Sequence, residues 1–97
     1  MTTWFTVDTT YIPDRDLLQA VRPDHRAYLG GLVESGRVVA AGPWADDSGG
    51  FAVFKVADRA ELDELLAVDP YTERGVAAGR TVREWTIVLG PLAPPKD

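Results

Sequence analysis

The sequence contains no cysteine, which excludes disulfide bonds, thiolate nucleophiles and thiolate metal ligands. It also contains only one histidine, His25, whereas zinc and non-haem iron sites usually require several nitrogen or sulfur ligands. We therefore expect no metal and no cofactor. Any chemistry must depend on His25, carboxylates, hydroxyls or the backbone.

Long apolar runs and an excess of positive charge are also missing. No stretch approaches the roughly 20 apolar residues that a membrane span requires, and the N-terminal residues lack the basic and then apolar layout of a signal peptide. Ten Lys and Arg residues face 15 Asp and Glu residues, giving a net charge of -5 that repels nucleic acid and anionic membranes. We predict a cytoplasmic protein that binds neither nucleic acid nor membrane.

The composition that remains is typical of a small globular domain. The chain has 97 residues, of which 45% are hydrophobic and 26% are charged, so it can bury one modest core. Three prolines fall within residues 91–97, which predicts a flexible C-terminal tail after a single domain over residues 1–90.

Residue patterns predict four strands and two helices. β-branched and aromatic residues indicate strands at 3–11, 37–43, 51–56 and 83–89, with a hairpin loop at 45–50. Pro23 at a first helical position and Gly36 as a stop signal predict a helix over 23–35, preceded by a short helical turn at 14–21. Asp58 and Glu61 are spaced as a helix cap, and Pro70 ends this second helix before a loop or short helical segment at 71–79.

The resulting order, βαββαβ, predicts an α+β ferredoxin-like fold with a four-stranded antiparallel sheet and two helices on one face. Apolar residues nevertheless occupy both faces of the predicted strands, such as Phe51 and Val53 against Phe54 and Val56. A large uncovered apolar face usually binds another protein surface, so we expect a homodimer formed through the open sheet face. Alternatively, the tail or the 71–79 segment covers part of that face.

Spacing brings His25 and Asp69 to the same end of this fold. His25 lies on the apolar stripe of the first predicted helix, and Asp69 continues the apolar face of the second. The two helices are antiparallel, so the start of one lies beside the end of the other. A carboxylate on one imidazole nitrogen leaves the other free to move a proton, which makes both residues candidate catalytic groups. The alternative is that Asp69 only satisfies a buried histidine.

Four further residues are candidates for substrate binding, and each has a purely structural alternative. Arg22 either binds an anionic group or is solvated surface, and Trp85 either forms a pocket wall or belongs to the core. Gly42 and Pro43 either leave room for a ligand or only form a turn.

Two consecutive glycines, Gly30 and Gly31, lie inside the first predicted helix. Each destabilises a helix by about 1 kcal/mol relative to alanine. We interpret them as the site of a close backbone approach by another element.

Several of these residues occur in an order that resembles the YciI-like (YCII-related) family. The resemblance extends from about Trp4 to Leu89, and the residues that carry it are Arg22-Pro-Asp-His25, Tyr28-Leu29, Leu32, Gly36, Ala41-Gly42-Pro43, Gly50, Glu61 to Leu66, Asp69-Pro70, Gly75 and Trp85. The resemblance implies a ferredoxin-like fold of the dimeric α/β barrel type, a homodimer, and an active site built on His25 and Asp69.

These observations lead to a functional hypothesis with two rivals. The first is a cofactor-independent enzyme that performs lyase-like or isomerase-like acid-base chemistry on a small polar or aromatic molecule, by analogy with a related dehydrochlorinase. The second is a non-catalytic dimeric module that binds a small molecule or serves a larger enzyme. A third is an oxygenase of the same barrel group.

Overall fold

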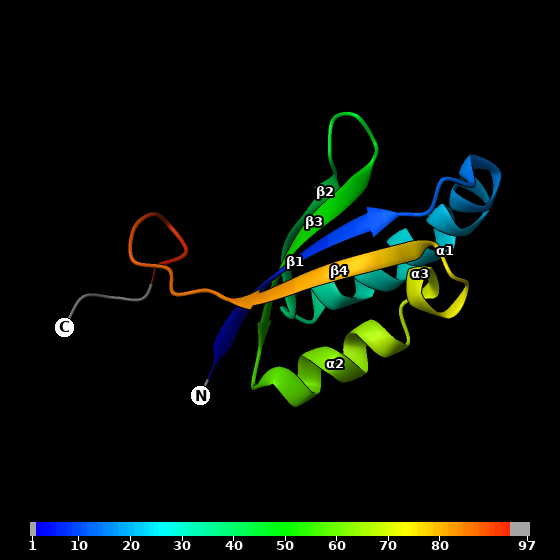
Figure 1. Cartoon of the computed structure of the whole chain (residues 1–97). Coiled ribbons are helices and arrows are strands. Elements are labelled where there is room, and N and C mark those ends of the chain that lie inside the picture. The colour runs from blue at the N-terminus through cyan, green and yellow to red at the C-terminus, as the bar shows by residue number, and fades with distance from the viewer. Residues whose placement is uncertain (1, 94–97) are drawn as a thin grey trace.

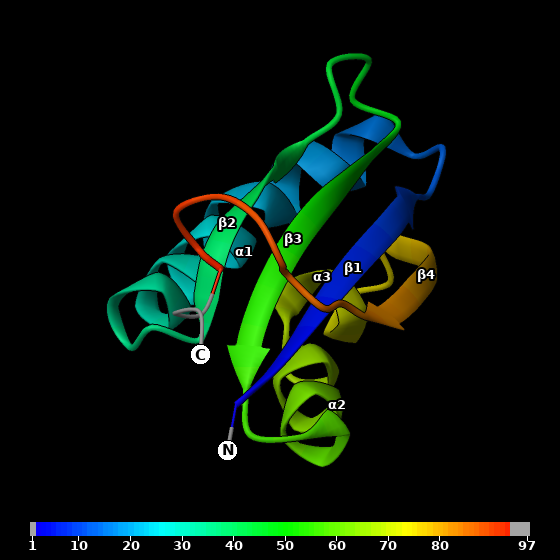
Figure 2. The same ribbon diagram turned by 90° about the vertical axis from the view of Figure 1, so that its left-hand side faces the viewer.

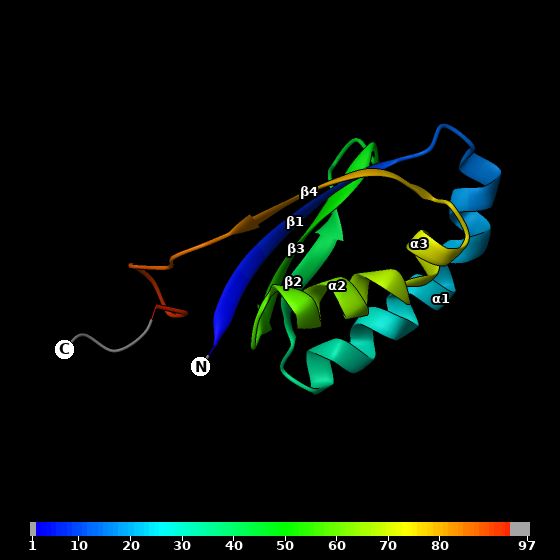
Figure 3. The ribbon, with the colours of Figure 1, turned by 60° about the horizontal axis from the view of Figure 1, so that its bottom comes forward.

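The computed structural model describes residues 2–93, so residues 94–97 of the predicted tail lie outside the described part. Seven elements follow one another along the chain: β1 (Thr3–Tyr11), α1 (Arg15–Glu34), β2 (Val38–Pro43), β3 (Gly49–Val56), α2 (Arg59–Ala67), α3 (Pro70–Glu73) and β4 (Ala77–Glu84). The strands form one antiparallel sheet in the order β2-β3-β1-β4 (Figure 1). The helices cover one face of this sheet (Figure 3). The predicted ferredoxin-like α+β fold is confirmed.

The prediction for the first helix is wrong at its N-terminal end. One helix runs from Arg15 to Glu34 with Pro23 inside it. The Asp14 side chain caps this helix by accepting a hydrogen bond from the Leu17 N–H at 3.1 Å. Leu18 and Val21 are completely buried, and packing of such an apolar face outweighs the backbone hydrogen bond that a proline removes. His25 therefore lies near the middle of α1 and not in its first turn.

The last strand also differs from the prediction, which placed it at residues 83–89. β4 lies at Ala77–Glu84 because it pairs with β1, whose Phe5 stands opposite Glu84. The next backbone hydrogen bond, from the Trp85 N–H to the Trp4 carbonyl, is 2.8 Å long. Because β1 begins at Thr3, it has almost no residue left to pair with the chain after Trp85. That chain leads away from the sheet, and its colour changes from orange to red (Figures 1 and 3).

Two clusters of buried side chains form the core on the helix face. The larger lies under α1 and α2 and contains Phe5, Val7, Leu32, Val38, Phe54, Val56 and Leu62. The smaller lies under the N-terminal half of α1 and α3, and contains Leu18, Val21, Tyr71 and Val76. α1 spans both clusters. Within residues 2–93, no helix combines the length and apolar character needed to cross a bilayer.

The opposite sheet face is aromatic at its edges and polar in between. Trp44 lies 5.6 Å from Phe51, measured between ring centroids, and its indole N–H donates to Asp8 at 3.3 Å. Lys55 lies over the ring of Trp4. The expectation of an apolar face is therefore only partly correct, since Thr6, Asp8 and Thr10 alternate with the buried residues of β1.

The 71–79 segment does not cover this face, and the chain after β4 is buried at only one large apolar residue, Ile87. Tyr71 and Val76, from the 71–79 segment, pack into the smaller core cluster on the helix face. After β4, Ile87 is 7% exposed, whereas Val88 and Leu89 are 70% and 80% exposed. Val53, opposite Thr6 on this face, is 8% exposed. Viewed from the left of Figure 1, the segment that follows β4 passes in front of the sheet (Figure 2), and Figure 1 shows it standing away from β2 and β3. Three aromatic side chains of the open face, Trp44, Phe51 and Trp85, stay exposed.

Candidate active site

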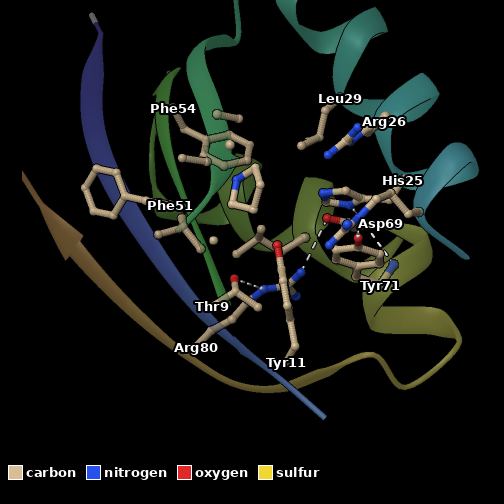
Figure 4. Close-up of a pocket in the computed structure, with 18 of the residues that line it drawn as sticks. Thr9, Tyr11, His25, Arg26, Leu29, Phe51, Phe54, Asp69, Tyr71 and Arg80 are labelled. Atoms are coloured by element: carbon tan, nitrogen blue, oxygen red, sulfur yellow. Dashed lines mark hydrogen bonds and ion pairs between the residues drawn. The ribbon is translucent and has the colours of Figure 1, made fainter. Parts of the chain in front are cut away.

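A cavity of about 320 Å³ opens on the helix face of the sheet and is lined by members of both core clusters. One stripe of α1, spaced by three and four residues, forms a wall: Arg22, His25, Arg26, Leu29, Gly30 and Val33. Apolar groups such as Val7 and Phe54 from the sheet lie opposite, and Asp69, Tyr71 and Arg80 close one end (Figure 4). The pocket therefore combines a largely apolar body with a polar end.

His25 and Asp69 are in direct contact at this polar end. The imidazole Nδ1 lies 2.7 Å from Oδ1 of Asp69. The same carboxylate accepts hydrogen bonds from the Tyr71 N–H at 2.9 Å and from Arg80 Nη2 at 3.3 Å. A carboxylate engaged with three donors acts only as an acceptor, so the ring proton belongs on Nδ1. The sequence predicted this contact, but Asp69 achieves it as the N-cap of α3 and not as a residue of α2.

The other imidazole nitrogen, Nε2, faces the pocket. It has no hydrogen-bond partner in the part of the chain that the structure describes. No fully buried side-chain nitrogen or oxygen in residues 2–93 lacks a partner, so Nε2 is accessible to solvent. In the neutral ring this nitrogen carries a lone pair and can accept a proton.

Tyr71 holds the imidazole ring in place. Its aromatic ring stacks on His25 with centroids 3.7 Å apart and planes 2° from parallel. Tyr71 is itself buried, and its hydroxyl accepts a hydrogen bond from Arg22 Nε at 3.2 Å. The stack and the Asp69 contact together restrict rotation of the ring, so that Nε2 keeps one direction.

Arg80 balances the charge of Asp69 inside the pocket. Its guanidinium also donates to Thr9 Oγ1 at 3.2 Å and to the Thr72 hydroxyl. Burial lowers the pKa of Arg80, and the negative charge of Asp69 opposes this effect. Arg80 escaped the sequence analysis because residues 71–79 were assigned to a loop and the last strand was placed too late.

Arg22 lines the pocket, but its positive charge is already paired. Its Nη2 lies 2.7 Å from Oδ1 of Asp47, in the loop between β2 and β3. This hydrogen bond, together with the one to Tyr71, raises the pKa of Arg22, and Arg22 in turn lowers the pKa of the Asp47 carboxyl. Arg22 was predicted to bind an anionic group; in the structure its charge is paired with Asp47, and its Nε supports the ring of Tyr71.

The remaining predicted residues divide into two groups. Gly42 and Pro43 line the pocket from the end of β2. Trp85 does not, because it lies with Thr6, Thr81 and Arg83 on the open sheet face, where odd-numbered side chains of β4 point. Trp85 therefore forms neither the predicted pocket wall nor part of the core, since it is 43% exposed.

Two further polar residues that line the pocket, Tyr11 and Arg26, were not predicted from the sequence. The Tyr11 hydroxyl points into the cavity (Figure 4), where it also interacts with the Arg22 guanidinium. Burial raises the pKa of Tyr11 and outweighs the hydrogen bond and charge of Arg22, which favour a lower pKa, so the hydroxyl stays protonated and can donate. Both residues carried a signal in the sequence: Tyr11 shares the alternation of Phe5, Val7 and Thr9, and Arg26 lies four residues after Arg22 on the helix.

The two helical glycines do not have the predicted close neighbour. A Cβ atom built on Gly30 or on Gly31 would have no atom of another residue within 4 Å. Gly30 lines the cavity, whereas Gly31 does not. The absence of a side chain at Gly30 therefore enlarges the pocket and does not serve packing between elements.

Fold and site together define a class: a small α+β protein whose helix-face pocket holds a histidine oriented by an aspartate. The sequence model of the YCII-related domain family matches residues 4–86. The chain belongs to this family. No curated protein sequence matches it.

Three solved structures share the fold. TftG, a 5-chloro-2-hydroxyhydroquinone dehydrochlorinase from Burkholderia phenoliruptrix AC1100 in complex with 2,5-dihydroxybenzoquinone, is 23% identical with a TM-score of 0.74, covering 84% of this chain and 92% of its own. A candidate antibiotic biosynthesis monooxygenase from Bacteroides thetaiotaomicron is 15% identical with a TM-score of 0.56, covering 97% and 96%. Rv0793 from Mycobacterium tuberculosis is 16% identical with a TM-score of 0.54, covering 99% and 100%.

Proposed function

We propose that the protein is a cofactor-independent enzyme that moves a proton on a small molecule, with His25 as the acid-base group and Asp69 as the residue that orients it. The observation that carries this proposal is the geometry of one ring. Nδ1 is held by a carboxylate at 2.7 Å, and Nε2 opens into a cavity of about 320 Å³. A group positioned in this way typically accelerates a reaction by about 10²- to 10⁴-fold.

The reaction is of the lyase or isomerase type. Nε2 takes a proton from an O–H or C–H bond of the substrate, and the electron pair left behind forms a new double bond. In a lyase step a leaving group departs with its bonding electrons, so the substrate loses H⁺ and an anion without any oxidant. In an isomerase step His25 returns the proton to another atom of the same molecule.

The alternative of a binding module without chemistry explains less of the site. Binding alone requires shape and hydrogen bonds, but it does not require a fixed imidazole tautomer. In this pocket Asp69, Tyr71 and Arg80 all act on the orientation or charge of one histidine contact. Because these contacts fix the orientation of one nitrogen, Nε2 of His25, the site favours proton transfer over binding alone.

The structural similarity to TftG supplies a probe for this proposal. Incubation of the protein with 5-chloro-2-hydroxyhydroquinone should release chloride faster than buffer does, as measured with a chloride electrode. Chloride release equal to the uncatalysed rate, with the probe shown to occupy the pocket, would contradict lyase chemistry of this kind.

The paired glycines of α1 provide a test of the pocket itself. Gly30→Ala and Gly31→Ala should each raise the free energy of unfolding by about 1 kcal/mol, because alanine is the better helix former and both sites are open. Only Gly30→Ala places a methyl group in the cavity, so it alone should weaken binding of 2,5-dihydroxybenzoquinone, by about tenfold. Thermal unfolding and spectrophotometric titration measure the two effects. If the two variants bound 2,5-dihydroxybenzoquinone equally well, the compound would not occupy the cavity beside Gly30.

We also propose that two copies of the chain associate through the open sheet face. This face contains Trp4, Trp44 and Trp85, which are all the tryptophans of the sequence, together with Phe51. Trp44 and Trp85 are 45% and 43% exposed. Large aromatic side chains gathered on one surface are typical of protein interfaces.

Sedimentation velocity tests the homodimer. The wild-type chain should sediment at twice its chain mass at micromolar concentration, and Trp85→Glu should shift it to the monomer because it buries a charge in the interface. Val68→Glu is the matched control, since Val68 is 52% exposed at the end of α2. A wild-type monomer, or dissociation by both variants, would disprove association through this face.

A further inference from the structure

Positive charge collects in the pocket of a chain that is acidic as a whole. The net charge is -5, yet the ionisable groups that line the cavity include three arginines, Arg22, Arg26 and Arg80, and only one carboxylate, Asp69. A cavity with an excess of one charge attracts ligands of the opposite charge.

Two of the three arginines are already neutralised. Arg22 pairs with Asp47 at 2.7 Å, and Arg80 pairs with Asp69 at 3.3 Å. Arg26 makes no hydrogen bond or ion pair with any residue in the range 2–93. Its side chain nevertheless reaches from α1 toward the cavity, next to His25 (Figure 4). Arg26 is therefore the cation that the folded chain leaves available to a ligand.

The Tyr11 hydroxyl is a second group that can still bind a ligand in the cavity, because Arg22 only donates to it and the O–H proton remains available. It projects from the end of β1, across the cavity from Arg26 (Figure 4), and lies above Gly50, where a Cβ atom would be 2.7 Å from the hydroxyl oxygen. The protonated hydroxyl offers one hydrogen bond to an acceptor. Apolar side chains such as Leu29 and Phe54 line the same cavity.

We infer that the ligand of this pocket is an organic anion with a flat apolar body, whose charged group binds Arg26 and whose second oxygen accepts a hydrogen bond from Tyr11. This inference rests on the proposed function for the location of the site. It adds the class of the substrate and two residues that determine specificity. An arginine binds a carboxylate, phenolate or enolate through hydrogen bonds between opposite charges, whereas a neutral analogue offers no negative charge to the guanidinium.

Benzoate and benzamide form a matched pair of probes, because they share shape and differ in charge. Isothermal titration of the full chain should show benzoate binding at least about tenfold more tightly than benzamide, the difference expected for a hydrogen bond to a charged group. Arg26→Gln should reduce this preference to less than about twofold, whereas Tyr11→Phe should weaken benzoate by about threefold to tenfold. Arg59→Gln, on the exposed side of α2, should leave the preference unchanged.

Two results would overturn the inference: equal affinity of the wild type for both probes, or a preference for benzoate that survives in Arg26→Gln. The titration of His25→Gln separates this inference from the proposed function. If Arg26 selects the anion, that variant keeps the preference for benzoate, whether or not the protein catalyses proton transfer. If the preference disappears in His25→Gln and persists in Arg26→Gln, the imidazole binds the anion and the assignment to Arg26 is wrong.

Discussion

Replacement of His25 by glutamine is expected to lower chloride release from 5-chloro-2-hydroxyhydroquinone by a factor of about 10² to 10⁴, which is the usual contribution of a positioned acid-base group. Glutamine is the appropriate substitute because its amide N–H can still donate to Oδ1 of Asp69, where the imidazole Nδ1 lies at 2.7 Å. It offers no basic nitrogen to the pocket. The fold should therefore survive while proton transfer is lost.

The comparison requires evidence that the variant is folded. We expect the thermal midpoint of His25→Gln to stay within a few degrees of the wild type, since a change of 1 kcal/mol shifts a domain of this size by about 4–8 °C. Arg59→Gln, at an exposed ion pair of α2, serves as the control with full activity. A His25→Gln protein with the wild-type rate would eliminate His25 as the acid-base group.

Substitution of Gly49 by alanine should produce the largest loss of stability. Gly49 begins β3, and a Cβ atom there would lie 2.1 Å from the Thr9 carbonyl oxygen. The clash is with backbone of the central strand, which has no rotamer to change, so we expect the free energy of unfolding to fall by about 3 kcal/mol or more. Urea denaturation measures this loss. Because Thr9 and Tyr11 line the pocket, displacement of β1 should also weaken ligand binding.

Gly79 is the matched control for this substitution. Thr10 of β1 pairs with Gly49 on one side and with Gly79 on the other. A Cβ atom on Gly79 would meet no atom within 4 Å, so Gly79→Ala should be neutral or stabilising by up to about 1 kcal/mol. A similar loss from both variants would mean that glycine is needed for flexibility and not for the close approach at Gly49.

The sequence predicted the fold well where local signals agreed with tertiary packing. Strand alternation in β1, the Asp58 cap of α2 and the stop at Gly36 all appear in the structure. The errors arose where packing overrides local preference. Pro23 lies inside α1 because Leu18 and Val21, which precede it, are buried in the smaller core cluster and hold that half of the helix in place. Ala77 and Gly79 form a strand because β1 pairs with them.

The same distinction applies to the candidate site. The contact of His25 with Asp69 followed from helix spacing and topology, so it could be predicted without coordinates. Whether each arginine is already paired with a carboxylate could not be predicted, because it depends on contacts between distant residues such as Arg22 and Asp47. Periodicity shows which side chains face the pocket, whereas only the structure shows which of them are already engaged. Arg26 and Tyr11 emerged as available groups in that way.

The tautomer of His25 tests the central claim most directly. His25 is the only histidine in the sequence, so the ring nitrogens of the uniformly ¹⁵N-labelled, untagged chain give unambiguous long-range ¹H–¹⁵N correlations. At a pH where the ring is neutral, we predict the proton on Nδ1 and an unprotonated Nε2 whose resonance shifts when 2,5-dihydroxybenzoquinone is added. A neutral ring that carries its proton on Nε2 would contradict the account, because no lone pair would then face the cavity.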